Sequence, residues 1–373
     1  MSDPTLTAPP SGPVVRPGIL DIAPYVGGES KIPGANRIIK LASNESALGP
    51  SPKAIEALKA HAASMHRYPD GSGVELRTAL ARHFGLDADR IVCGNGSDEL
   101  ISLLVRAYAG PGDEVLYSHH GFLMYAISAL GVGATPVTAP EIELTADVDA
   151  LLAAVTERTR IVFLANPNNP TGTCLPAAEV RRLHAGLPPH VVLAIDAAYA
   201  EYVEDAEYEP GIELVLAADN VVMLRTFSKI YALGGMRVGW AYCPPGIADV
   251  LNRLRGPFNV SAASQAAAVA ALADVEHMRK SLDHNRVWRD WSAAEFTRLG
   301  LGVVPSHGNF LLVRFPDTPA HNADSGFEFL KTRGIIARKV VAYHLAEYLR
   351  ITIGTEEEMR IAAAALRDFL GTR

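Results

Sequence analysis

A lysine flanked by hydroxyl groups and followed by an arginine is the feature of this sequence best suited to chemistry. The segment Thr226-Phe227-Ser228-Lys229 precedes the glycine-rich run Gly234-Gly235-Met236-Arg237-Val238-Gly239. Two hydroxyls and a planar guanidinium suit a phosphate, and glycines let the backbone turn tightly around an anion. Ser-Lys alone is a weak signal, because a solvated surface lysine would show the same pair. The strand predicted beside Arg237 favours the functional interpretation, a reactive amine next to a bound phosphate.

Two further segments follow predicted strands and carry polar side chains. Asn166-Pro167-Asn168-Asn169-Pro170-Thr171-Gly172 comes after one strand, and Asp196-Ala197-Ala198-Tyr199 ends the next. Open α/β sheets place ligand groups at such strand ends, although either segment alone could be a common turn or a helix cap. Together with Lys229 they supply what a pyridoxal ring requires. An aspartate keeps the ring nitrogen protonated, which makes the ring an electron sink, and Asn169 and Tyr199 can bond its phenolic oxygen.

Five more motifs occur in an order and spacing that resemble a known family. They are Leu41-Ala42-Ser43-Asn44-Glu45, Gly49-Pro50-Ser51-Pro52, Tyr68-Pro69-Asp70, Gly94-Asn95-Gly96-Ser97-Asp98-Glu99 and Leu349-Arg350-Ile351-Thr352-Ile353-Gly354. With the three segments above, they resemble the aspartate-aminotransferase superfamily of fold type I. Within it the sequence is most similar to the histidinol-phosphate aminotransferases, from about Arg16 to the C-terminus. Several of the motifs also occur in neighbouring aminotransferase subfamilies.

The resemblance implies pyridoxal 5'-phosphate as the cofactor and assigns catalytic roles to Lys229, Asp196 and Tyr199. Lys229 would bind the cofactor covalently and, once released, move the proton between substrate and cofactor. Asp196 would pair with the pyridine nitrogen, while Asn169 and Tyr199 would contact the phenolic oxygen. Phe122 would stack on the ring, although His120-Gly121 stand where the family often has a proline and a small polar residue.

The resemblance also implies a binding site for the cofactor phosphate. Its members would be the side chains of Thr226, Ser228 and Arg237 and the backbone around Ser97 and Asp98. The last two residues begin a predicted helix, where free N–H groups and the helix dipole favour an anion. Tyr68 would reach the phosphate of the partner subunit, so the resemblance implies a homodimer with shared active sites.

Substrate choice depends on fewer residues. Arg350 matches the family arginine that binds the carboxylate of the amino donor, and Asn44 stands among the expected substrate-binding residues. Arg338 and Tyr25 resemble positions that hold the phosphate of histidinol phosphate, which suits arginine forks and a hydroxyl. Arg338 could instead be an exposed charge, and Tyr25 a packing aromatic beside Pro24. The implied reaction passes an amino group from glutamate to imidazole-acetol phosphate, giving 2-oxoglutarate and L-histidinol phosphate, a step of histidine biosynthesis.

Four other functions compete with this interpretation. An aromatic-amino-acid aminotransferase is the nearest, because an aromatic ring can occupy the imidazole pocket. An amino-acid-phosphate decarboxylase would use the same electron sink. A cofactor-binding regulator would carry a DNA-binding module, for which we expect no room before Arg16. A catalytically silent partner protein is disfavoured because Lys229 and every other cofactor-contacting residue type is present.

The elements that must position these residues alternate between strands and helices. Strands are predicted at 91–93, 114–118, 134–138, 160–165, 191–196, 220–225 and 238–243, with helices such as 97–109 and 176–184 between them. Short strands separated by helices favour an α/β fold whose large domain has a mostly parallel, doubly wound sheet. Later, 265–299 is Ala-rich and helical, 310–315 and 349–353 look like strands, and 356–370 is a helix. This change of character predicts a smaller α/β domain built from both chain ends.

We therefore expect four regions along the chain. They are a disordered tail at 1–15, an N-terminal segment at 16–65 that joins the small domain, a large cofactor-binding domain at 66–270 and a C-terminal small domain at 271–373.

Composition fits a soluble, cytoplasmic enzyme. The 373 residues are 49% hydrophobic and 20% charged, and the formal net charge of −7 argues against nucleic acid as a partner. Met1–Pro13 does not resemble a signal peptide, and no apolar run is long enough to span a membrane. Cys93, Cys174 and Cys243 show no metal-binding spacing and suit buried thiols in a reducing cytosol.

Adjacent histidines at 119 and 120 could suggest a metal site. We place them on a strand, where neighbouring side chains point to opposite faces, so that joint ligation is not expected. A structural role is the better interpretation, and no metal site is predicted.

Overall fold

Buried, apolar strands build the centre of the molecule. The structure is a computed structural model that describes residues 15–25, 27–34 and 37–371. Most of the predicted tail at 1–15 therefore lies outside the described residues. Within them, seven strands form the central sheet, in the order β2 (Ile91–Gly94), β10 (Gly239–Tyr242), β9 (Val221–Thr226), β8 (Val192–Asp196), β7 (Thr159–Ala165), β3 (Glu114–Ser118) and β4 (Thr135–Ala139). β10 is antiparallel to both neighbours, and all other pairs are parallel. The predicted mostly parallel sheet is confirmed.

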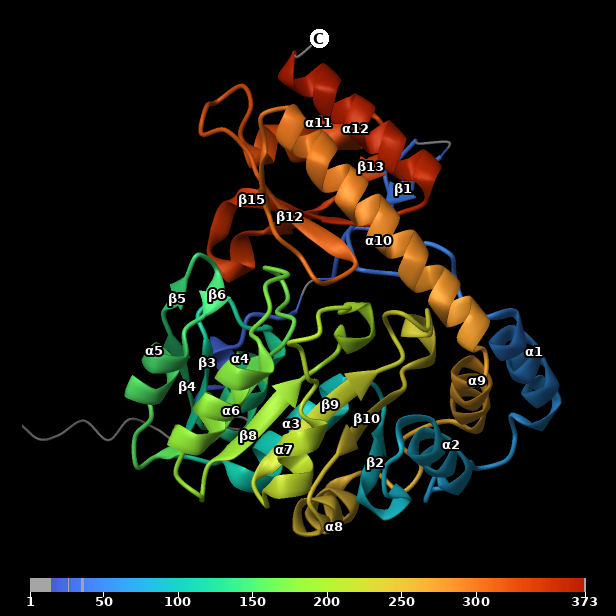
Figure 1. Cartoon of the computed structure of the whole chain (residues 1–373), viewed down its shortest axis with the longest axis vertical. Coiled ribbons are helices and arrows are strands. Elements are labelled where there is room, and N and C mark those ends of the chain that lie inside the picture. The colour runs from blue at the N-terminus through green and yellow to red at the C-terminus, as the bar shows by residue number, and fades with distance from the viewer. Residues whose placement is uncertain (1–14, 26, 35–36, 372–373) are drawn as a thin grey trace, which may run out of the picture.

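Helices cover both faces of this sheet, as a doubly wound fold requires (Figure 1). One face packs against α3 (Ser97–Tyr108), α4 (Met124–Val132) and α8 (Pro245–Leu254). The other packs against α2 (Val74–Phe84), α5 (Val148–Ala153), α6 (Ala177–Gly186), α7 (Ile212–Ala217) and α9 (Ala262–Leu272). Along β8, Leu193 and Ile195 enter the second core, while Val192 and Ala194 enter the first. Strands buried on both faces read as continuous apolar runs, which explains why the sequence reveals them.

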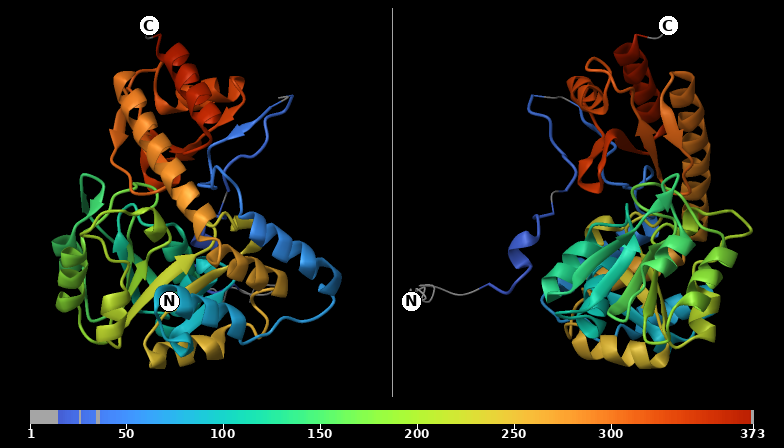
Figure 2. Two further views of the ribbon diagram at one scale, coloured as in Figure 1. Left: turned by 45° about the vertical axis from the view of Figure 1, so that its right-hand side comes forward. Right: turned by 90° about the vertical axis from the view of Figure 1, so that its left-hand side faces the viewer.

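A smaller sheet lies above the carboxyl ends of the central strands (Figures 1 and 2). In the described part of the chain its order is β11 (Gly302–Val304), β12 (Phe310–Arg314), β15 (Leu345–Thr352) and β14 (Arg338–Val340), and every pair is antiparallel. It shares a core with α10 (Val275–Arg298), α11 (Ala323–Thr332) and α12 (Glu356–Leu370). β1 (Ile39–Lys40) joins this unit by pairing in parallel with β13 (Ile335–Ile336). The expectation of a smaller α/β unit built from both chain ends is confirmed.

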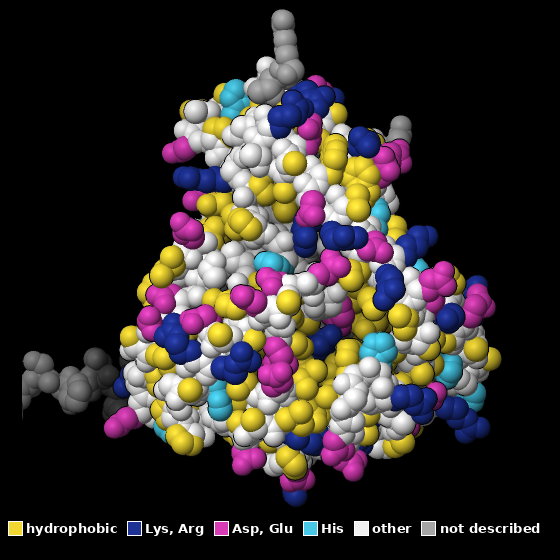
Figure 3. Space-filling model, in the orientation of Figure 1, with side chains coloured by type: hydrophobic (Ala, Val, Ile, Leu, Met, Phe, Trp, Pro, Cys, Tyr) yellow, Lys and Arg dark blue, Asp and Glu magenta, His cyan; other side chains and the backbone are white. Residues whose placement is uncertain are grey.

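The remaining elements are short or peripheral. α1 (Pro52–His61) packs on α9, and β5 (Glu141–Ile142) pairs with β6 (Thr145–Ala146). Short 3-10 turns occur at Ile19–Asp21, Ala62–Ser64, Ala88–Arg90, Ala200–Tyr202, Gly234–Met236 and Val341–Tyr343. Basic and acidic side chains are interspersed over the face shown in Figure 3. Among the described helices, none combines the length and apolarity needed to cross a membrane.

Several strand bounds differ from the predicted ones by one residue, and three further elements differ as follows. The helical stretch predicted at 265–299 is two helices, α9 and α10, with a break at Asp274. The Asp274 carboxylate accepts a hydrogen bond from Ser51, the N-cap of α1, and forms an ion pair with Lys53 in α1. Pro176 is the N-cap of α6 rather than a residue of its first turn. β15 begins at Leu345, four residues before the predicted start, and Ala346 and Glu347 in its first half are exposed.

Candidate active site

A cavity of about 370 Å³ lies where the carboxyl ends of β7, β8 and β9 face the smaller sheet. The last residues of these strands, Ala165, Asp196 and Thr226, line its floor. Parallel strands that begin at one edge of a sheet also end together, so three distant segments meet here. Of the fifteen site residues predicted from sequence, all of them described, fourteen line the cavity: Tyr25, Asn44, Ser97, Asp98, Phe122, Asn169, Asp196, Tyr199, Thr226, Ser228, Lys229, Arg237, Arg338 and Arg350.

Tyr68 is the predicted site residue that does not line this cavity. Its side chain is 83% exposed and stacks on Phe258, with the ring centroids 4.7 Å apart. Its expected contact is with the phosphate of a partner subunit, which a single chain does not test. That assignment stays a prediction.

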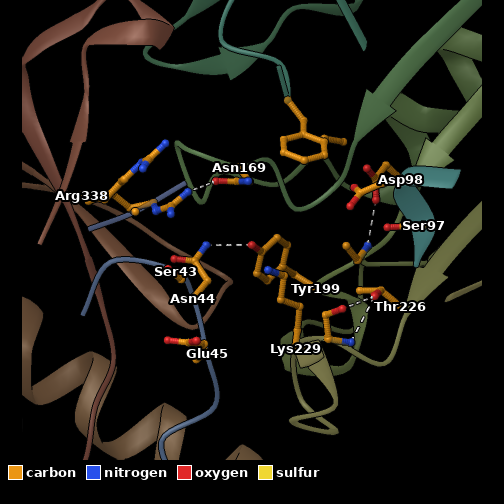
Figure 4. Close-up of a pocket in the computed structure, with 18 of the residues that line it drawn as sticks. Ser43, Asn44, Glu45, Ser97, Asp98, Asn169, Tyr199, Thr226, Lys229 and Arg338 are labelled. Carbon is orange, nitrogen blue, oxygen red and sulfur yellow. Dashed lines mark hydrogen bonds between the residues drawn. The ribbon is translucent and has the colours of Figure 1, made fainter. Parts of the chain in front are cut away.

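One end of the cavity collects hydrogen-bond donors (Figure 4). The Thr226 hydroxyl donates to Ser228 Oγ at 3.0 Å, and Arg237 Nη1 donates to the same oxygen at 3.3 Å. Arg237 Nη2 also donates to Asp98 Oδ2 at 3.0 Å, at the first turn of α3. Among the described residues no side chain caps α3, because its N-cap is Gly96, and its first N–H groups remain available to an anion.

Two glycines let these donors approach one another. A Cβ at Gly96 would come within 2.2 Å of Arg237 Nη2. A Cβ at Gly239 would come within 2.4 Å of the Ser97 backbone nitrogen. A cation, two hydroxyls and a helix N-terminus held this closely are the donor set that a phosphate monoester needs. The residues present therefore fit the phosphate of pyridoxal phosphate.

Replacing Gly239 with alanine is expected to weaken the binding of pyridoxal phosphate and to lower the free energy of unfolding by about 1–3 kcal/mol. The added methyl group would meet backbone atoms of Ser97 and Gly96, so that α3 or β10 must shift. Gly235→Ala is the matched control, because no described atom outside its own short stretch of chain lies within 4 Å of the Cβ it would add. Cofactor titration and denaturant unfolding check both variants. Equal affinities for the two would contradict this account of the donor cluster.

Lys229 lies on the segment that follows β9, beside the Tyr199 ring. Its Nζ is 5.4 Å from the centroid of that ring. The Tyr199 hydroxyl accepts a hydrogen bond from Asn44 Nδ2 at 2.8 Å, and Thr352 Oγ1 donates to Asn44 Oδ1 at 3.2 Å. The amine and the phenol therefore face one space, and the N-terminal segment orients the phenol.

Asp196 is a carboxylate almost closed off from solvent. It is 5% exposed, and its Oδ2 accepts a hydrogen bond from the Tyr125 hydroxyl at 2.8 Å. The backbone N–H of Ala198 donates to Oδ1 at 3.3 Å. Burial raises the pKa of Asp196 to about 6, the Tyr125 bond opposes that rise, Asp98 adds to it and Lys229 opposes it. Such a carboxylate is stabilised by a cationic partner, which fits the protonated nitrogen of a pyridine ring.

Two arginines of the smaller sheet face the opposite end of the cavity. Arg338 on β14 and Arg350 on β15 are register partners, so they lie side by side. Arg350 is buried, donates through Nη1 to Asn169 Oδ1 and through Nη2 to Ala42 O at 3.0 Å, and its Nε finds no acceptor among the described residues. Burial lowers its pKa. Two guanidinium groups at one end suit a carboxylate or a phosphate.

The structure corrects the predicted location of the adjacent histidines His119 and His120. His119 and His120 do not lie on a strand but in the turn after β3, where their ring centroids are 4.7 Å apart. His120 Nδ1 lies 2.6 Å from Glu141 Oε2, and His119 stacks on His344 with centroids 5.4 Å apart. The chain turns because Gly121 N–H donates to Ser118 O. The expectation that these side chains point to opposite faces of a strand was wrong.

Several residues at the site had no predicted role. Ser43 and Glu45 line the cavity and stood in a quoted motif, while Gly27, Gly28 and Ala42 line it from the N-terminal segment. Tyr125 contacts Asp196 from behind the cavity wall. Its one sequence signal is a position three residues after Phe122, which lies just before α4.

Known proteins resemble the chain over nearly its whole length. The family described as aminotransferase class I and II matches residues 36–366. The chain is 61% identical to a histidinol-phosphate aminotransferase of Paramagnetospirillum magneticum, covering 97% of this chain and 99% of that protein. It is 59% identical to the enzyme of that name from Rhodospirillum centenum, covering 96% and 99%. Histidinol-phosphate aminotransferase from Sinorhizobium meliloti, solved in complex with pyridoxal-5'-phosphate, superposes with a TM-score of 0.84 at 32% identity, covering 90% and 92%.

Proposed function

This chain belongs to the class I and II aminotransferases, and from that membership we propose that it passes an amino group between L-histidinol phosphate and 2-oxoglutarate in histidine biosynthesis. It is a pyridoxal-phosphate-dependent transaminase. The observation that carries the substrate assignment is the pair of register partners Arg338 and Arg350 at one end of the cavity. The full-length similarity to histidinol-phosphate aminotransferases supports the same assignment.

When bound, pyridoxal phosphate supplies an electron sink for the charge that develops at the substrate carbon. Thr226, Ser228, Arg237 and the first turn of α3 bind its phosphate group. The Asp196 carboxylate holds a proton on the ring nitrogen, because a buried anion favours a cation beside it. The phenol of Tyr199 and the amide of Asn169 orient the phenolic oxygen, and Phe122 covers the ring. Lys229 Nζ takes the proton from the substrate carbon and returns it, as a general base and then a general acid.

Substrate binding in this proposal uses the arginine end of the cavity twice. The planar fork of Arg350 binds the carboxylate of glutamate, with Asn44 beside it. Arg338 and Tyr25 bind the phosphate of L-histidinol phosphate. Because both groups are anions, one pocket serves both substrates in turn.

We further propose a cytoplasmic homodimer, in which Tyr68 of each subunit reaches the phosphate of the other. Support comes from the exposed aromatic pair Tyr68 and Phe258, since contiguous exposed apolar surface marks interfaces. The free thiols of Cys93, Cys174 and Cys243 suit a reducing compartment. Within each chain we propose an N-terminal segment at 16–65 that joins the small domain, a large cofactor-binding domain at 66–270 and a C-terminal small domain at 271–373.

The substrate proposal is tested by a pair of half-reactions. Enzyme loaded with the amino group of glutamate is mixed separately with imidazole-acetol phosphate and with phenylpyruvate, and the phosphorylated acceptor is expected to react faster. Arg338→Gln should slow that acceptor by roughly ten- to a hundredfold, the worth of a lost charged hydrogen bond, and change phenylpyruvate little. Arg333→Gln, a half-exposed arginine paired with Asp368, is the matched control. Faster reaction of phenylpyruvate in the wild type would favour an aromatic-amino-acid aminotransferase and overturn the proposal.

A further inference from the structure

Tyr125 is a buried tyrosine whose hydroxyl reaches the cavity only through Asp196. It lies in the first turn of α4, is fully buried, and its hydroxyl donates to Asp196 Oδ2 at 2.8 Å. Burial raises the pKa of this phenol well above its usual value of about 10. The phenol therefore keeps its proton over the whole working range of pH and always acts as a donor.

The ring of Tyr125 is held on three sides. It stacks on Phe163 with centroids 4.4 Å apart and an interplanar angle of 2°. Edge contacts come from Tyr117 at 5.7 Å and from Phe122 at 5.9 Å. The Tyr125 N–H also donates to Phe122 O at 3.0 Å, which places both residues in one turn. The position of the hydroxyl is therefore fixed by packing before any ligand binds.

Asp196 depends strongly on this one donor. The groups facing its carboxylate are Tyr125 from α4, Asp98 from α3, Lys229 from the segment after β9 and the backbone N–H of Ala198. Asp98 repels the negative charge, and Lys229 attracts it. Without the phenol, the described residues would offer the carboxylate one long backbone hydrogen bond of 3.3 Å. A buried carboxylate with so little support favours its protonated form.

We propose that Tyr125 is a positioning residue of the aminotransferase reaction, whose hydroxyl keeps Asp196 ionised and fixes the orientation in which that carboxylate meets the ring nitrogen of the cofactor. This inference rests on the proposed function. A tyrosine that merely satisfies its own buried hydroxyl would contribute to stability alone. A positioning tyrosine also changes cofactor affinity and the protonation of the bound ring. The two roles are therefore separable by experiment.

Tyr125→Phe tests the proposal, because it removes one oxygen and leaves the stacked ring in place. The dissociation constant of pyridoxal phosphate should rise by about tenfold, and the glutamate half-reaction should slow by roughly ten- to a hundredfold. The absorbance of the bound cofactor should titrate at a different pH from that of the wild type. Tyr117→Phe removes a hydroxyl from a buried tyrosine in the same core and should leave all three readouts within about twofold.

A double-mutant cycle isolates the route through Asp196. In an Asp196→Asn chain, adding Tyr125→Phe should change cofactor affinity little, because the charge that the phenol supports is already gone. If the two substitutions instead lower cofactor affinity by independent factors that multiply in the double variant, the proposal is overturned. A Tyr125→Phe enzyme that loses stability but keeps wild-type affinity, half-reaction rate and absorbance titration would overturn it as well. Phe163→Leu, which keeps the hydroxyl and removes its stacking partner, should weaken cofactor binding in the same direction, and unchanged binding would count against the proposal. A wild-type enzyme that transfers no amino group would instead refute the proposed function.

Discussion

Replacing Lys229 with alanine is expected to abolish amino transfer, slowing the glutamate half-reaction by at least about 10⁴-fold. In the proposed mechanism, the variant loses both the amine that holds the cofactor covalently and the base that moves the substrate proton. The donors around Ser228 and Arg237 are untouched, so the cofactor should still bind, more weakly and without covalent attachment. Stopped-flow absorbance measures the rate, and the absorbance band of the covalent adduct should be missing.

The control for this experiment is Lys59→Ala, an exposed lysine on α1 whose side chain is paired with Glu56. It should transfer amino groups at the wild-type rate. Added methylamine should restore part of the rate of Lys229→Ala, since a free amine can take the place of the missing base. A Lys229→Ala enzyme that kept its covalent adduct and full turnover would show that another amine carries the chemistry.

Replacing Asp196 with asparagine is expected to slow the half-reaction by about 10²–10³-fold and, at the same time, to stabilise the cofactor-free protein. In the proposed mechanism, the rate falls because a neutral amide would not hold a proton on the ring nitrogen, and losing one partner of a buried ion pair costs about 3–5 kcal/mol. The cofactor-free protein gains stability because burial disfavours the Asp196 charge, raising its pKa to about 6. A residue that costs stability and serves activity is a common feature of active sites.

The pH dependence of the second effect has a definite sign. Since the pKa of Asp196 is about 6 in the folded chain and 3.8 is its ordinary value, the folded state holds the proton more tightly than the unfolded state. The contribution of Asp196 to the free energy of unfolding is therefore greatest below about pH 4, falls as the pH rises to about 6 and then levels off. The stability advantage of Asp196→Asn should grow across this window to roughly 2–3 kcal/mol.

Denaturant unfolding of the cofactor-free proteins between pH 4 and 8 measures this difference. Asp290→Asn, which alters an exposed carboxylate on α10, should show no such growth. Saturating pyridoxal phosphate should reverse the order, because the cofactor stabilises the folded wild type more than the variant. A wild type that is the more stable protein at pH 7 without cofactor would contradict the burial argument.

Local patterns in the sequence were enough to predict much of the fold and the residues at the floor of the site. β7, β8 and β9 are apolar runs, and parallel strands end at a common edge, so the side chains of Asp196 and Thr226 could be expected to meet. α12 has the predicted ends, Glu356 and Leu370. A capping box of Thr355 and Glu358 marks its start, and Gly371, with a φ of 65°, marks its end. In such cases the forces that determine structure act between residues close in the chain.

The features missed depend on contacts between distant residues. The bond from Tyr125 to Asp196 joins positions 71 residues apart and requires side-chain packing that no spacing in the sequence reveals. The break at Asp274 depends on Ser51, 223 residues earlier in the chain. The strand was predicted to end at Ser118, as it does, yet His119 and His120 were placed on a strand instead of in the turn that follows it. Even so, pattern and resemblance placed fourteen side chains around one cavity.

The pairing of β1 with β13 has a consequence for the order of events on the ribosome. Leu41 N–H donates to Ile336 O, Asn44 N–H donates to Thr352 Oγ1, and Asn309 Nδ2 donates to Asn44 O. Asn44, which orients the Tyr199 phenol, is thus held by Thr352, a residue synthesised about 300 residues later. A nascent chain can form the phosphate end of the pocket well before it can form the other end. The complete binding geometry for the cofactor therefore forms only after β15, the last strand, has left the ribosomal exit tunnel.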